Sequence, residues 1–134
     1  MAGVVVLDAS ALIALHDSKD RHHTWARGMF LDTIDATLAM SVLTYAEVLV
    51  HPTRAGKVAE CEQNIAGLGI EIVAVGTEDA PALAHLRAST SLTMPDVFVL
   101  HLAAGLGASL ATTDRVLAGE AALLGLTVLE PQPV

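Results

Sequence analysis

Short apolar runs alternate with longer helical stretches along this chain, and that alternation constrains the fold more than any other feature. The expected strands are 3–8, 36–40, 70–75, 108–113 and 126–131. The expected helices are 9–17, 20–34, 41–51, 57–69, 77–90, 94–107 and 115–125. Pro52 should end the third helix. Strands that alternate with helices predict right-handed crossovers and a parallel sheet covered on both faces.

The size and composition favour one globular domain. The chain has 134 residues, of which 53% are hydrophobic. We therefore expect a single domain over 1–134 with a sizeable core. No apolar run is long enough for a membrane span, and "MAG" lacks the charged region of a signal peptide. Cys61 is the only cysteine, which leaves no internal disulfide and no cysteine zinc cluster. We expect a cytoplasmic protein without a membrane partner.

The charge balance is acidic. The formal net charge is -8, with only 7 lysines and arginines. This argues against a protein that coats nucleic acid with a basic face. It does not argue against an enzyme that meets a phosphate through a metal ion, because the cation then supplies the positive charge.

Four acids stand at positions where a site is expected. Asp8 and Asp114 each follow a predicted strand, at the sheet edge where ligands of parallel sheets bind. Asp96 lies in the first turn of an apolar helix, and Glu47 lies within a helix among apolar neighbours. If the four converge, their charges repel, and a divalent cation such as Mg²⁺ would resolve the repulsion. A metal-bound water is a nucleophile suited to a phosphodiester.

Helix capping is the competing interpretation. Asp8 and Asp114 could be N-caps, and Asp96 could simply suit the positive end of a helix dipole. Glu47 is harder to explain in this way, because a carboxylate in an apolar setting needs solvent or a partner. On the capping interpretation, the chain is a non-catalytic α/β binding module.

A phosphate-transfer domain of receiver or dehalogenase type is the second alternative. Such domains also place acids at strand ends. The dehalogenase pattern has a second Asp two residues after the first, where this chain has Ser10. A receiver domain has a lysine after a late strand, and neither Lys19 nor Lys57 stands there.

Four segments carry a family resemblance. "VVVLDASALIAL", "LTYAEVL", "MPDVFVLHLA" and "LATTDRVL" occur in this order. They resemble the four acidic motifs of PIN-domain ribonucleases, and their spacing is similar to that of VapC-type toxins of bacterial toxin-antitoxin pairs. The resemblance implies a three-layer α/β/α sandwich with a mainly parallel sheet. It also implies a Mg²⁺- or Mn²⁺-dependent endoribonuclease that leaves a 5′-phosphate and a 3′-hydroxyl, forms a homodimer and is inhibited by a cognate antitoxin.

The resemblance also implies roles for single residues. The predicted metal-binding and catalytic residues are Asp8, Glu47, Asp96 and Asp114, with Asp8 and Asp96 as principal ligands and the other two acting directly or through water. Thr112 matches the hydroxyl of "TxD" and would orient an acid or a phosphate. Ser10 matches a small polar position of the first motif. Local backbone hydrogen bonding would explain Ser10 and Thr112 equally well.

The remaining polar residues form no recognisable site. The six histidines show no metal-ligand spacing, which favours structural or surface roles. Val116 and Leu117 stand where some family members have a further acid, which argues against a filled second metal site. Trp25 is expected in the core or at an interface. Four basic residues could meet RNA phosphates, although scattered surface charge explains them as well: Arg21, Arg54, Lys57 and Arg115.

Overall fold

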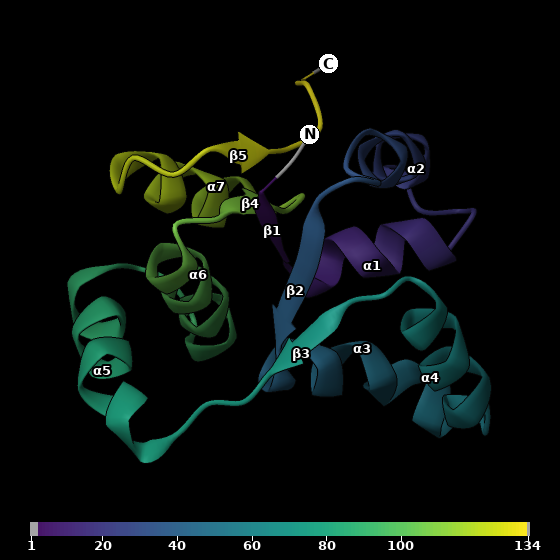
Figure 1. Cartoon of the computed structure of the whole chain (residues 1–134), viewed down its shortest axis with the longest axis horizontal. Helices are drawn as coiled ribbons and strands as arrows, with labels where there is room; N and C mark the ends of the chain where they lie inside the picture. Colours follow the sequence, from purple (N-terminus) through teal and green to yellow (C-terminus); the bar gives the residue numbers. More distant parts are fainter. Residues whose placement is uncertain (1–2, 134) are drawn as a thin grey trace.

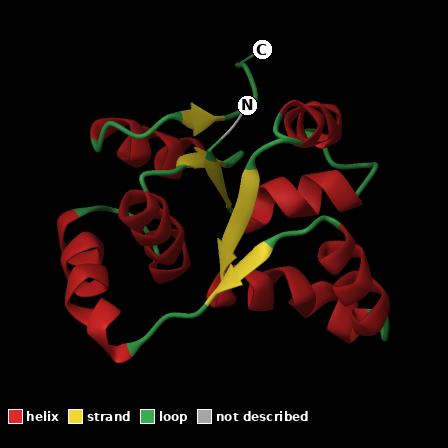
Figure 2. Cartoon of the chain, in the orientation of Figure 1, coloured by secondary structure: helices red, strands yellow, loops and turns green. Residues whose placement is uncertain are grey.

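The centre of the protein is a parallel β-sheet. The computed structural model describes residues 3–133. The strands are β1 (Val4–Leu7), β2 (Thr37–Ser41), β3 (Glu71–Val73), β4 (Ser109–Ala111) and β5 (Val128–Leu129). Their order is β3-β2-β1-β4-β5, and every neighbouring pair is parallel. The predicted α/β class is confirmed, and the sheet is wholly parallel over these strands (Figure 2).

Helices cover both faces of the sheet. They are α1 (Ala9–His16), α2 (His23–Asp32), α3 (Val42–Arg54), α4 (Val58–Gly67), α5 (Ala80–Ser89), α6 (Met94–Leu106) and α7 (Arg115–Leu123), with the 3-10 turn η1 (Thr77–Asp79) before α5. Helices α1 to α4 lie on one side of the sheet and α5 to α7 on the other (Figure 1). This is the expected three-layer α/β/α sandwich.

The central strand β1 divides the core into two clusters. Val5 and Leu7 pack in the cluster under α1 to α4, whereas Val6 packs in the cluster under α5 to α7. All three side chains are buried. Successive side chains of a strand point to opposite faces. A continuous apolar run is therefore what a strand covered on both faces requires.

The third helix is longer than the sequence predicts. Pro52 lies inside α3, which continues to Arg54. Pro52 stands in the last turn, where its missing N–H removes only one hydrogen bond. The turn is closed by later donors, since Ala55 N donates to His51 O at 3.0 Å and Lys57 N donates to Pro52 O at 2.8 Å. The expectation that Pro52 ends the helix is therefore wrong by three residues.

The two edge strands are shorter than predicted. The expected strands 70–75 and 126–131 are reduced to β3 and β5. Each edge strand has one neighbour and pairs only as far as that neighbour extends. Val73 pairs with Ser41, the last residue of β2, and Leu129 pairs with Ala111, the last residue of β4.

Within residues 3–133, no helix is long and apolar enough to cross a membrane.

Candidate active site

The carboxyl ends of β1 and β4 bring the first and fourth acidic segments together. These strands are neighbours, and Asp8 N donates to Ala111 O at 3.0 Å. Asp8 directly follows β1, and Asp114 lies shortly after β4. The strand order thus places both carboxylates at one edge of the sheet, as the sequence predicts.

Asp8 is held by three hydrogen bonds. Its Oδ2 accepts from Ser10 Oγ and from Thr112 Oγ1, each at 2.7 Å. Its Oδ1 accepts from Ala9 N at 2.9 Å. The Asp8 side chain is buried, with 7% of the residue exposed. A buried carboxylate with hydroxyl donors on one oxygen is fixed in orientation.

The same two hydroxyls connect the first motif to the fourth. Ser10 Oγ accepts from Thr113 N, and Thr112 Oγ1 accepts from Asp114 N, both at 3.0 Å. The bond from Ser10 to Asp8 is local hydrogen bonding of the kind that the sequence predicts, because the two residues are two positions apart. The bond from Thr112 to Asp8 is long-range and joins two strand ends.

Capping also occurs, as the competing interpretation expects. Asp8 is the N-cap of α1, and Asp114 is the N-cap of α7. Asp114 Oδ1 accepts from Val116 N at 2.9 Å and from Leu117 N at 3.1 Å. Both caps use Oδ1, and Asp114 Oδ2 forms no hydrogen bond within residues 3–133. Capping therefore explains these two acids only in part.

Asp96 and Glu47 are not caps. Asp96 lies in the first turn of α6, whose N-cap is Thr93, and its Oδ2 accepts from Thr93 Oγ1 at 3.0 Å. Glu47 is half-buried on α3. Within the described part of the chain, its carboxylate forms neither a hydrogen bond nor an ion pair. Helix capping gives no reason for an acid at this position.

The four carboxylates influence one another electrostatically. Burial raises the pKa of Glu47 above its ordinary value, and the charges of Asp8 and Asp96 raise it further. Burial likewise raises the pKa of Asp96. The Thr93 hydroxyl opposes this effect, while the charges of Asp114 and Asp8 add to it. The negative charges of Asp8 and Asp114 therefore act on Asp96, and those of Asp8 and Asp96 act on Glu47, which places the four carboxylates in one acidic region.

No basic side chain of residues 3–133 forms an ion pair with these four acids. The ion pair formed within residues 3–133 lies elsewhere, between His101 Nε2 and Asp79 Oδ1 at 2.9 Å. It ties α6 to the start of α5, and it lowers the pKa of Asp79. His101 thus has the structural role that the sequence favours for the histidines.

The donor set suits a hard cation, although the acids do not form a closed cage. An ionised carboxylate has about four acceptor positions, so three hydrogen bonds leave roughly one on Asp8, at Oδ1. Oxygens of Glu47, Asp96 and Asp114 are also available. However, no three His, Cys, Asp or Glu side chains of residues 3–133 lie close enough to hold one ion. Mg²⁺ commonly binds through one or two carboxylates and keeps several waters. The ligand roles of the four acids remain predictions.

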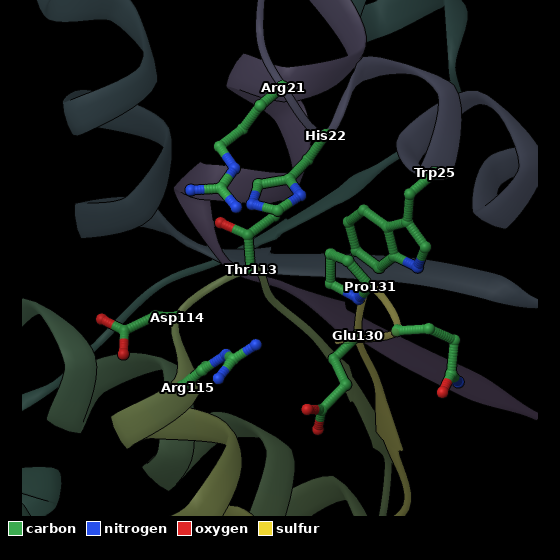
Figure 3. A pocket seen from close by; sticks show the side chains of 9 residues that line it. Arg21, His22, Trp25, Thr113, Asp114, Arg115, Glu130 and Pro131 are labelled. Atoms are coloured by element: carbon green, nitrogen blue, oxygen red, sulfur yellow. The ribbon is translucent and has the colours of Figure 1, made fainter. Parts of the chain in front are cut away.

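Two cavities flank the acids. Asp114 lines a pocket of about 500 Å³ together with Arg21, Trp25 and Arg115 (Figure 3). Glu47 lines another cavity, of about 590 Å³, between α1, α3 and α4. The sequence could not show that Arg21 and Arg115 share a pocket. The only signal was that Arg115 directly follows Asp114 within the fourth motif.

Several solved structures share this fold. A toxin-antitoxin complex from Klebsiella pneumoniae is 22% identical, with a TM-score of 0.72, over 86% of this chain and 91% of that one. The sarcin-ricin loop cleaving toxin VapC20 of Mycobacterium tuberculosis is 11% identical, with a TM-score of 0.75, over 87% and 94%. VapBC2 of Rickettsia felis, bound to a promoter DNA fragment, is 13% identical, with a TM-score of 0.71, over 95% and 98%. These likenesses concern the fold.

The family follows from the sequence itself. Comparison with curated proteins gives no match. A sequence model of the PIN domain matches residues 5–121, which span β1 to α7 and contain all four acids described above. Because this match covers most of its length, the chain belongs to the PIN domain family.

Proposed function

We propose that this protein is a Mg²⁺- or Mn²⁺-dependent endoribonuclease that acts as the toxin of a toxin-antitoxin pair. One observation carries the proposal: the charges of Asp8, Asp96 and Asp114 act on Glu47 or Asp96, and none of the four acids pairs with a basic side chain of residues 3–133. Such a cluster destabilises the protein unless a cation offsets it. PIN domains are generally nucleases, and the cluster lies at their acidic motifs.

The expected role of each acid follows from the hydrogen bonds and burial of its side chain. Asp8 is fixed by Ser10 and Thr112 and would be the rigid metal ligand, with Asp96 beside it. The cation, when bound, would make a water nucleophilic and neutralise charge on the phosphate. Glu47 has no hydrogen-bond partner within residues 3–133 and a raised pKa, so its carboxylate is suited to accept the proton of the attacking water. Water would add to phosphorus and the 3′-oxygen would leave, giving a 5′-phosphate and a 3′-hydroxyl.

The toxin role is supported by the structural relatives. A toxin-antitoxin complex from Klebsiella pneumoniae shares the fold, and VapC20 is a toxin that cleaves the sarcin-ricin loop. We propose by analogy that this protein cuts cellular RNA in the cytoplasm, forms a homodimer and is inhibited by a cognate antitoxin protein.

Mapping cut sites in total RNA tests the activity. The wild type with Mn²⁺ should produce defined cuts with 5′-phosphate ends, and Asp8→Asn should abolish them. Asp79→Asn is the matched control, since it makes the same chemical change at a carboxylate outside the cluster. Cuts that persist in Asp8→Asn, or that persist in a chelator, would refute the proposal.

A thermal scan separates this proposal from a non-catalytic binding module. Asn caps a helix about as well as Asp, so capping alone predicts that Asp8→Asn leaves stability nearly unchanged with or without metal. Metal binding predicts that Mn²⁺ at 100 times its dissociation constant stabilises the wild type by about 2.7 kcal/mol. Asp8→Asn should lose most of this gain. A wild type that does not respond to millimolar Mn²⁺ would favour the binding module.

A further inference from the structure

The pocket beside Asp114 has a composition that the acid cluster does not explain. It is built from the turn before α2, the start of α7 and the segment after β5. Its volume is about 500 Å³. Asp114 lies at one end of it, and Trp25 and Pro131 lie at the other (Figure 3). The pocket therefore continues directly from the proposed catalytic edge.

Two arginines line this pocket, together with two carboxylates, those of Asp114 and Glu130. Arg21 and Arg115 are both exposed, and neither pairs with a carboxylate of residues 3–133. The whole chain has only 7 lysines and arginines against a net charge of -8. The two guanidinium groups offset the two carboxylates, so the pocket is formally neutral within an acidic chain. Unpaired guanidinium groups suit phosphate oxygens.

Trp25 supplies an aromatic wall. The residue is half-buried, and its side chain packs on the core cluster under α1 to α4. Trp25 lies on α2 and lines the end of the pocket next to Pro131 (Figure 3). An aromatic side chain anchored in this way can stack on any base, because every base has a π-face. An aromatic wall beside arginines is the combination that binds single-stranded nucleic acid.

We propose that this pocket binds a nucleotide of single-stranded RNA next to the phosphate that is cut. Arg21 and Arg115 contact backbone phosphates, and Trp25 stacks on the base. Glu130 also lines the pocket, and its carboxylate opposes the phosphates. This inference rests on the proposed ribonuclease function, because Asp114 is shared by the pocket and the acid cluster.

Binding in the absence of metal tests the pocket without cleavage. The probe is a fluorescein-labelled single-stranded RNA of mixed sequence, followed by anisotropy in EDTA. Arg21→Ala/Arg115→Ala should weaken binding about tenfold or more, and the slope of log affinity against log salt should fall by about 1.4, at 0.7 per phosphate contact. Arg27→Ala/Arg87→Ala is the matched control, with the same change of charge at exposed arginines that do not line the pocket. It should change the affinity less than twofold.

Two further variants test the two other features. Trp25→Leu should weaken binding about fivefold or more, with its fold checked by circular dichroism. Glu130→Gln should strengthen binding, a change that misfolding cannot mimic. An equal loss in both arginine pairs, or no loss in the pocket pair, would overturn the proposal. So would a duplex RNA of the same sequence binding more tightly than the single strand.

The two proposals fail in different experiments. Metal-dependent cuts that Asp8→Asn abolishes, together with unchanged RNA affinity in the pocket variants, would retain the ribonuclease and reject the pocket. Pocket-dependent RNA binding without any metal-dependent cuts would reject the ribonuclease and leave an RNA-binding site.

Discussion

Two buried threonines allow a sharp test of the hydrogen bonds around Asp8. Thr112 is 0% exposed, and its hydroxyl donates to Asp8 and accepts from Asp114 N. Thr44, on α3, is 1% exposed, and its hydroxyl has no hydrogen-bond partner within residues 3–133. Replacing each by valine makes the same chemical change at two sites with opposite hydrogen bonding.

The expected effects have opposite signs. Thr112→Val removes a bond to a charged acceptor, worth about 1.5–3 kcal/mol, and leaves the Asp114 N–H without its acceptor. The two losses overlap, and we expect a total cost of roughly 2–4 kcal/mol. Thr44→Val removes a buried hydroxyl that makes no bond, and should stabilise the protein by about 1–3 kcal/mol.

Equilibrium urea denaturation at pH 7 in EDTA measures both changes. Far-ultraviolet circular dichroism gives the midpoint and slope for the wild type and each variant. Thr112→Ser is the third variant, because it keeps the hydroxyl and should cost only about 1 kcal/mol for the lost methyl group. The reasoning would be refuted if Thr112→Val and Thr44→Val shifted stability equally, or if Thr112→Ser were as costly as Thr112→Val.

Three further predictions concern the carboxylates and one turn. Glu47→Gln should stabilise the metal-free protein at pH 7. The folded pKa of Glu47 is raised above the ordinary 4.5, so its charge costs stability at higher pH. Urea midpoints in EDTA should show the gain at pH 7 and lose it below pH 4.5. Asp79→Asn should destabilise the protein at pH 7. The lowered pKa of Asp79 contributes stability at pH values above its ordinary pKa of 3.8, and this contribution is lost as the pH falls through the folded pKa. Urea midpoints of the two proteins should therefore converge in acid. Gly107→Ala should lower the free energy of unfolding in urea by about 1–2 kcal/mol, because Gly107 ends α6 with a left-handed φ of 59°. Gly105→Ala, within the same helix, is the control and should not share this cost.

Much of the local structure could be predicted from the order of residue types. Repeated strands and helices predict a covered parallel sheet, and Asp8 and Asp114 stand where N-caps belong. These are short-range relations, since the two caps bond N–H groups one to three residues ahead. The ends of elements were less predictable. Pro52 stays within α3 because later backbone donors close the last turn, and β3 and β5 stop where their single neighbours stop.

The composition of the site depended on tertiary structure. β1 and β4 are adjacent only because of the strand order, and this adjacency brings Thr112 to Asp8. Arg21, in the turn before α2, and Arg115, at the start of α7, line one pocket. No sequence pattern measures such distances. The acid motifs alone could not show that the carboxylates repel one another while no three of them can hold one ion.

The sequence by itself therefore determined the layers of this protein and the residue types at each strand end. The tertiary structure decided which of those residues meet. The physical reason is range: helix formation and capping depend on neighbours within one turn, whereas the contacts of the candidate site join segments whose proximity is set by the packing of the whole sheet.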